Sequence, residues 1–352
     1  MRSLLTVFAI VGLVLASAAS AEVNIVTVPV GNVGNTGELS GSGAGGYGSD
    51  RICGAVGYEY RIGKYEVTAG QYTEFLNAVA DTDTYGLYKT KMDTDISYLG
   101  CNIKRNGSPG SYTYSVDANW ANRPVNYVSW SDAARFANWL HNGQPEGNQD
   151  LTTTEDGAYF LNGAITDVAL LSVVREPDWK WAIPSEDEWY KAAYHKNDGI
   201  AGNYWDYPTG TDAMPGGDVS EATNPGNNAN YYYDPASYPI DSHYRTVVGE
   251  FELSESPYGT FDQGGNVFEY NEAIIDGAYR GKRGGSFGDN DDKMRSFYRE
   301  LYGSDVDAGV GFRVVQVPEP ATLSLLALGG LALIARRRRC ITNSGDTHLN
   351  SP

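Results

Sequence analysis

The sequence predicts a loop-rich α+β fold in a single domain. Three observations indicate this class: three short amphipathic helical segments, several short and scattered strand segments, and long stretches of Gly, Asn and Tyr between them. The chain has 352 residues, with 42 glycines and 26 tyrosines, and its apolar share of 41% is enough for a core. No internal repeat is visible, which argues against a solenoid or a propeller.

The first 21 residues have the pattern of a secretory signal peptide. Arg2 supplies the positive charge, residues 4–15 the apolar run, and Ala19-Ser-Ala21 a small-residue cleavage site. Cleavage there would leave Glu22 as the first mature residue. Residues 22–57 combine alternating valines with Gly, Asn and Ser, which predicts an N-terminal edge strand followed by a loop.

Three helices are predicted by the same two signals. Each begins with a Thr or Ser that can bond the backbone three residues later, where a Gln, Asp or Glu can bond back. Apolar residues then recur at helical spacing. The capping pairs are Thr68 with Gln71, Ser129 with Asp132, and Ser185 with Glu188, and Gly143 ends the second helix.

Strands are predicted before and after these helices. Residues 58–67 alternate in polarity ahead of the first helix, and residues 280–287 and 309–315 have the pattern of two closing strands. Residues 81–120 and 143–163 are polar and predict loops.

A glycine turn flanked by acids lies within residues 258–270. Asp262, the pair Gly264-Gly265 and Glu269 fall within eight residues that contain no basic side chain. Glycine permits a tight turn, and carboxylates with inward carbonyls are ligands that calcium prefers. The pattern also fits an ordinary glycine turn with solvated acids, and spacing alone favours that plainer interpretation.

Six blocks follow one another along the chain. They are Gly63-Lys-Tyr-Glu-Val-Thr68, Arg123-Pro-Val with Val128-Ser-Trp130, Ile183-Pro-Ser-Glu-Asp-Glu-Trp189, Gly265-Asn-Val-Phe-Glu269, Arg283-Gly-Gly-Ser-Phe287 and Gly311-Phe-Arg313. In this order they resemble the sulfatase-modifying-factor family, the formylglycine-generating enzymes and their relatives. The resemblance covers residues 58–316 and implies an unusual C-type-lectin-like fold that is poor in regular structure.

The resemblance also implies structural calcium ions. At the first site Asp262 and Glu269 would give side-chain oxygens, and Gly265 and Val267 main-chain carbonyls. At a second site the ligands would be Asn230, the carbonyl of Tyr231 and, with a gap in spacing, Asp241. Such ions order loops that lack regular hydrogen bonding.

The catalytic part of the family is not matched. Formylglycine generation uses two cysteines shortly after the Gly-Gly-Ser-aromatic block to bind copper, which prefers soft thiolates. Residues 288–295 contain no cysteine, and Met294, a lone soft ligand, is expected in the core. This argues against copper. We also expect no catalytic role for His141 or His195, since both fall at predicted helix C-termini, where the helix dipole favours a cation.

The C-terminal part resembles a PEP-CTERM sorting signal over residues 317–339. Val317-Pro-Glu-Pro320 precedes an apolar segment at 321–335 and an arginine block that ends at Arg339. The resemblance implies transient membrane association, processing by an exosortase, and delivery to the cell surface or extracellular matrix of a Gram-negative bacterium. The tail at 340–352 is longer than the signal usually carries.

The remaining two cysteines are predicted to form a disulfide. Cys340 lies in the tail, which leaves Cys53 and Cys101 as an even pair in an exported protein. A metal site is the alternative.

The net charge of −18 excludes nucleic acid and anionic lipid as expected partners, because the surface repels them. The sequence favours a non-catalytic surface or matrix module that binds a ligand such as a polysaccharide or another exported protein. The predicted ligand groove comprises Trp130, Asp289, Arg295 and Arg299, although buried arginines paired with acids fit as well. The alternatives are an enzyme of altered chemistry and a variable ligand-display protein on the same fold.

Overall fold

The computed structural model describes residues 22–217, 226–233, 239–300 and 306–317. The predicted signal peptide at 1–21 lies outside these ranges, as do the sorting signal beyond residue 317, its apolar segment, its arginine block and the tail. Within the described ranges, no helix is both long and apolar enough to cross a membrane.

The three predicted helices are confirmed, and each begins at its predicted cap. They are α1 (Ala69–Val79), α3 (Trp130–His141) and α5 (Glu186–Tyr194). In each, the capping side chain and the side chain three residues on both bond the backbone, which satisfies N–H groups that the first turn leaves free. Gly143, with φ +81°, directly follows the C-cap of α3.

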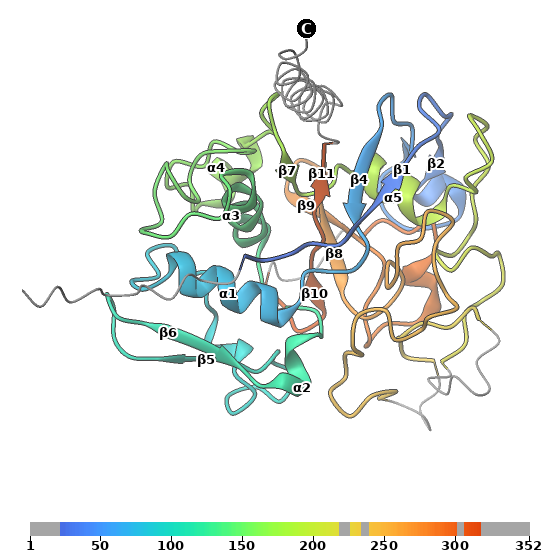
Figure 1. Cartoon of the computed structure of the whole chain (residues 1–352). Coiled ribbons are helices and arrows are strands. Elements are labelled where there is room, and N and C mark those ends of the chain that lie inside the picture. The colour runs from blue at the N-terminus through green and yellow to red at the C-terminus, as the bar shows by residue number, and fades with distance from the viewer. Residues whose placement is uncertain (1–21, 218–225, 234–238, 301–305, 318–352) are drawn as a thin grey trace, which may run out of the picture.

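Helices α1 and α3 pack together through aromatic rings. The buried ring of Phe136 on α3 lies 5.3 Å from Phe75 of α1 and 5.4 Å from Phe312, both edge to face, which is a favoured arrangement of aromatic rings. In Figure 1 these two helices lie on one side of the central strands and α5 lies on the other. The aromatic cluster thus joins both helices to the C-terminal part of the domain.

The main sheet joins the two ends of the domain. Its order is β1 (Thr27–Val30), β4 (Tyr60–Gly63), β11 (Val315–Gln316) and β7 (Trp181–Ala182), with all neighbours antiparallel. The predicted N-terminal strand is therefore confirmed as an edge strand. Because β11 inserts between β4 and β7, this sheet is complete only when the last strand is in place.

A second sheet contains the end of the 258–270 segment. It consists of β10 (Val310–Gly311), β8 (Phe268–Ile275) and β9 (Tyr279–Arg283), with β10 parallel and β9 antiparallel to β8. Two small two-stranded sheets, two short helices and three 3-10 turns complete the fold. They are β2 (Glu38–Ser40) with β3 (Arg51–Cys53), β5 (Ile103–Asn106) with β6 (Thr113–Val116), α2 (Ala118–Ala121), α4 (Asp167–Ser172), η1 (Ser42–Ala44), η2 (Thr90–Met92) and η3 (Asp291–Met294).

The structure corrects several sequence predictions of local structure. The loop predicted within residues 22–57 contains η1 and the β2–β3 pair, and the strand predicted at 280–287 ends at Arg283. The strand predicted at 58–67 is limited to β4. Residues 81–120, predicted as loop, contain the β5–β6 pair and α2. The glycine turn of residues 258–270 leads into β8, so Glu269 lies on a strand of the second sheet.

Candidate functional site

The glycine turn within residues 258–270 is fixed because its backbone lies very close to the backbone of the loop around Asn230. Gly265 has φ +82°, and a Cβ on it would lie 2.3 Å from the carbonyl oxygen of Asn230. Asn266 donates its main-chain N–H to that same oxygen at 2.7 Å. Only glycine fits this position without distortion, so the turn is held against the neighbouring loop.

Just beyond the turn, Glu269 is fully buried and paired with Arg313. Arg313 Nη2 lies 2.6 Å from Glu269 Oε1, and Arg313 Nε donates to Oε2. Oε2 also accepts a hydrogen bond from the indole N–H of Trp189 at 2.7 Å. The two-pronged pair therefore neutralises the Glu269 carboxylate.

Two further acids lie beside this pair, and one of them, Glu66, was not predicted as a site residue. Asp262 accepts a hydrogen bond from the main-chain N–H of Gly249 at 2.6 Å. Glu66 is 2% exposed, and within the described part of the chain neither of its carboxylate oxygens has a hydrogen-bond partner. Burial and the nearby charges of Asp262 and Glu269 raise the pKa of Glu66 well above its ordinary value, and burial also raises the pKa of Asp262.

A hard divalent cation would need oxygen ligands from carboxylates and from main-chain carbonyls of irregular loops. In the described ranges, however, no three or more His, Cys, Asp or Glu side chains are placed to hold a metal. An ion here would therefore need main-chain carbonyls, such as those predicted at Gly265 and Val267.

At the second predicted calcium site, the predicted ligand groups already make other contacts. Asp241 already accepts hydrogen bonds from Nδ1 and the main-chain N–H of His243, and pairs with Arg123 at 3.0 Å. These contacts hold the pKa of Asp241 below its ordinary value despite its partial burial. The main-chain carbonyl of Asn230 accepts from Asn266, and the predicted Tyr231 carbonyl already accepts the main-chain N–H of Tyr233 at 2.9 Å. This site remains a prediction.

The four residues of the predicted ligand groove lie in different surroundings, and the groove stays a prediction. Trp130 is 3% exposed and packs against Arg280, whose guanidinium carbon lies 3.6 Å from its ring centre. Arg295 stacks on Tyr207 and pairs loosely with Asp206 at 3.5 Å. Asp289 accepts from Ser286 and pairs with Lys293. Arg299 is buried against an acid, which is the alternative that the sequence left open.

The segment that carries copper-binding cysteines in the formylglycine-generating enzymes is closed by ion pairs in this chain. Lys293 lies 3.3 Å from Asp289 and 3.1 Å from Glu300. Met294 is fully buried in a small cluster with Tyr207, which confirms its predicted core position. The segment thus offers ammonium and carboxylate groups where the chemistry of copper(I) needs thiolates.

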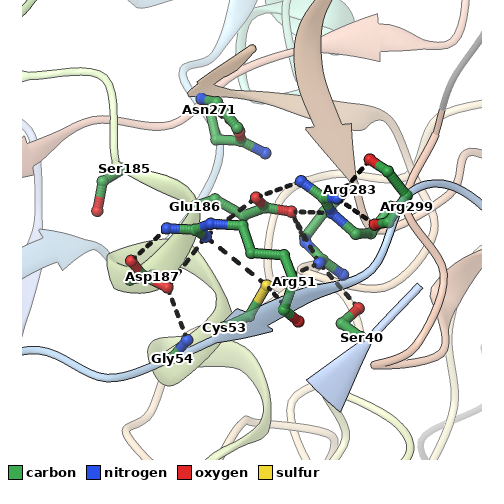
Figure 2. Close-up of polar contacts among 12 residues, drawn as sticks. Ser40, Arg51, Cys53, Gly54, Ser185, Glu186, Asp187, Asn271, Arg283 and Arg299 are labelled. Atoms are coloured by element: carbon green, nitrogen blue, oxygen red, sulfur yellow. Dashed lines mark hydrogen bonds and ion pairs between the residues drawn. The ribbon is translucent and has the colours of Figure 1, made fainter. Parts of the chain in front are cut away.

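A second unpredicted acid, Glu186, organises a cluster of three arginines, of which Arg283 and Arg299 are buried and Arg51 is partly exposed (Figure 2). Its carboxylate lies 2.8 Å from Nη2 of Arg283, 2.8 Å from Nε of Arg299 and 3.1 Å from Nη1 of Arg51. These guanidinium groups hold the pKa of Glu186 at about 2, although burial acts in the opposite direction. Its place in a recognised block, three residues before Trp189, was the available signal.

The predicted disulfide is absent, since Cys53 and Cys101 are both buried free cysteines. Cys53 packs with Trp189 near α5, and its sulfur lies 3.4 Å from Arg283 Nη2 (Figure 2). Cys101 belongs to the separate main core. An even cysteine count does not place two thiols side by side. Burial raises the pKa of both thiols, so both are protonated and unreactive at neutral pH.

A wide polar cavity, which we call the α3 basin, opens beyond the end of α3. Its volume is about 430 Å³, and it is lined by His141, Asn142, Leu151, Asp156, Gly157, Phe160, Glu176 and Asp178. The ring of Phe160 and the side chain of Leu151 are each half exposed. An apolar ring therefore lies in the wall of a cavity rich in oxygen acceptors.

His141 gives the basin a hydrogen-bond donor. Burial and the neighbouring Lys180 lower its pKa, so the imidazole is neutral at pH 7, and the expectation that the helix end would favour the cation is wrong here. Its Nδ1 accepts the main-chain N–H of Lys180 at 3.2 Å. The ring proton must then lie on Nε2, which can donate.

The chain folds into an irregular α+β domain. Its main sheet joins the first and last strands, and buried ion pairs hold its loops. The fold is of the formylglycine-generating-enzyme-like class. The chain belongs to the sulfatase-modifying factor enzyme 1-like domain family, whose profile matches residues 16–318. The PEP-CTERM protein-sorting motif matches residues 316–339. This motif marks an exported, surface-directed protein of Gram-negative bacteria that an exosortase processes.

Three solved structures are similar to the chain at low sequence identity. CarF matches with a TM-score of 0.51 and 19% identity, over 84% of this chain and 99% of its own. Treponema denticola variable protein 1 matches at 0.49 and 19%, over 85% and 97%. PvdO from Pseudomonas aeruginosa matches at 0.45 and 19%, over 83% and 94%. No curated protein matches the chain. The likeness to CarF concerns the fold alone.

Proposed function

We propose that this exported protein is a non-catalytic surface module that binds a neutral polysaccharide in the α3 basin. The observation that carries the proposal is the basin itself, an open cavity of about 430 Å³ lined mainly by polar groups, with the half-exposed Phe160 among its lining residues. It replaces the groove that the sequence predicted.

The chemistry of the basin suits a sugar. The apolar face of a sugar ring can lie on Phe160, while its hydroxyls donate to the carboxylates of Asp156, Glu176 and Asp178. His141 Nε2 can donate to a hydroxyl or ring oxygen in return. Three acids and a net charge of −18 would repel an anionic polymer, so the expected ligand is neutral or carries amino groups.

Replacing Phe160 by alanine is expected to weaken binding of the surface polysaccharide about thirtyfold, because a central aromatic anchor contributes about 2 kcal/mol or more. Isothermal titration calorimetry on the purified chain from Glu22 to Val317 measures this. Val168→Ala is the matched control, since Val168 is 83% exposed on α4 and does not line the basin. Equal affinity of the Phe160 variant and the wild type would contradict the assignment of the basin.

The proposal excludes copper-dependent formylglycine formation. We expect a cysteine-containing sulfatase peptide to stay unmodified when incubated with this protein, copper and oxygen, because residues 288–295 supply no thiolate. Mass spectrometry and an aldehyde-reactive probe would follow the peptide. Formation of an aldehyde at its cysteine would overturn the non-catalytic part of the proposal.

We also propose that a structural calcium ion stabilises the domain near Asp262. The support is the buried acidic group described above, in which a cation would offset the charge of the acids. This ion is separate from ligand binding in the α3 basin.

A further inference from the structure

We propose that a small pocket between α3, α4 and the turn that joins β8 to β9 binds a short-chain monocarboxylate. We call it the α4 pocket. Trp130, Leu170, Leu171, Ala278 and Arg280 are among its lining residues, and its volume is about 80 Å³. Figure 1 shows α4 beside α3. The pocket lies at the first turn of α3 and the α3 basin beyond its last turn, so the two sites are separate and the proposal does not depend on polysaccharide binding.

The first argument is that two buried donors in the wall of the pocket have no acceptor. Trp130 is 3% exposed and Arg280 is 9% exposed. In the described part of the chain, neither the indole N–H of Trp130 nor the Nε–H of Arg280 has a hydrogen-bond partner. The guanidinium carbon of Arg280 lies 3.6 Å from the ring centre of Trp130, so the two donors belong to one stacked pair. Buried donors without acceptors are costly, and a bound acceptor would remove that cost.

The second argument is the charge of Arg280. Its other nitrogens donate to main-chain carbonyls, Nη1 to Glu272 at 3.0 Å and Nη2 to Val173 at 2.7 Å and to Leu170. Among the described residues Arg280 forms no ion pair, because Glu272, whose charge acts on it, pairs with Arg175 at 2.6 Å instead. Burial lowers the pKa of Arg280 to about 10, so the group is still a cation at neutral pH. A bound carboxylate would give this buried cation its counter-charge.

The third argument is the size and chemistry of the remaining wall. Leu170 and Leu171 of α4 are partly exposed, and with Ala278 they place apolar surface in the same pocket as the two donors. Sites for drug-sized ligands usually have about 300 Å³ or more, so the α4 pocket suits a group of a few heavy atoms. The two oxygens of a carboxylate can accept from the two free N–H groups, while a short alkyl end lies against the leucines.

Asp167 limits the charge of the ligand. It lines the pocket from the first turn of α4 and is exposed. Its carboxylate would repel a second negative charge on the ligand, so a monocarboxylate is expected to bind more tightly than a dicarboxylate. The net charge of −18 opposes the approach of any anion, but salt screens this repulsion beyond about 10 Å at 0.1 M, whereas the contact with Arg280 is local.

Propionate, with propionamide as its neutral counterpart, provides the test. In NMR spectra of the purified protein labelled with ¹⁵N-tryptophan, propionate is expected to shift the indole signal of Trp130 in a saturable manner. Trp130→Phe identifies that signal by its loss. Propionamide should bind at least about tenfold more weakly, because it brings no charge to Arg280. Sodium chloride at the same ionic strength should leave the signal in place.

Ala278→Phe tests the location of the site. Ala278 is exposed on the β8–β9 turn, so a phenyl ring there is expected to fill the pocket and abolish the shift while circular dichroism shows an unchanged fold. Val168→Phe is the matched control, since Val168 is 83% exposed on α4 and does not line the pocket.

Three results would overturn the proposal. If neither compound shifts the Trp130 signal, the pocket is not a ligand site and holds water at most. Equal affinity for propionate and propionamide would contradict the role of the charge on Arg280. An undiminished shift in folded Ala278→Phe would place the binding elsewhere.

Discussion

Replacing Glu186 by glutamine is expected to lower the free energy of unfolding by about 3–5 kcal/mol, the usual cost of breaking a buried ion pair from one side. Glu186 is 3% exposed, and its carboxylate is ion-paired with Arg51, Arg283 and Arg299. In the variant only Asp187 would remain to pair with Arg51. Urea unfolding at pH 7, followed by far-UV circular dichroism, measures the loss.

The same residue predicts a dependence on pH. Its pKa of about 2 in the folded state lies below the ordinary 4.5, so the stability it contributes is present above pH 4.5. That contribution is lost as the pH falls from 4.5 towards 2, by about 3 kcal/mol for this shift. The glutamine variant should lack this part of the acid transition. An unchanged acid transition in the variant would show that the arginine cluster is not held by Glu186.

Phe136→Ala is expected to destabilise the domain by about 3–5 kcal/mol, because it opens a cavity in the aromatic cluster between α1 and α3. The fully buried ring of Phe136 contacts Tyr72, Phe75, Trp139 and Phe312. These contacts join α1, α3 and the segment after β10. Thermal and urea unfolding would both show the loss.

Phe160→Ala provides the contrast within the same chain. Phe160 is half exposed in the α3 basin, so its removal should change stability by no more than about 0.5 kcal/mol while weakening ligand binding. A large loss of stability in this variant would mean that Phe160 supports the fold. A small effect of Phe136→Ala would mean that the aromatic cluster does not hold the two helices together.

Local signals predicted the regular parts of the fold well. The capping pairs at Thr68, Ser129 and Ser185 each depend only on residues three positions apart, and all three helices begin where those pairs predict. The β5–β6 pair was missed even though Tyr112, Tyr114 and Val116 alternate with Ser and Thr over residues 111–116, because this short signal stands within a long polar stretch. The order of the six family blocks supplied the fold class that no single block could supply.

The site was predicted less completely, because its chemistry depends on contacts between distant segments. Nothing local to Glu66 reveals that its oxygens lack donors, or that Arg313 pairs with Glu269. The even number of cysteines outside the tail suggested a disulfide, yet Cys53 and Cys101 pack in different clusters.

Binding of the purified chain from Glu22 to Val317 to the producer's own surface polysaccharide tests the central claim most directly. Isothermal titration calorimetry with calcium, and again after chelation, would measure it on protein whose folding is verified by circular dichroism. Our account predicts saturable binding of the neutral fraction of that polysaccharide, with the same affinity after chelation as long as the protein stays folded. A folded protein that binds none of the fractions would contradict the proposed function.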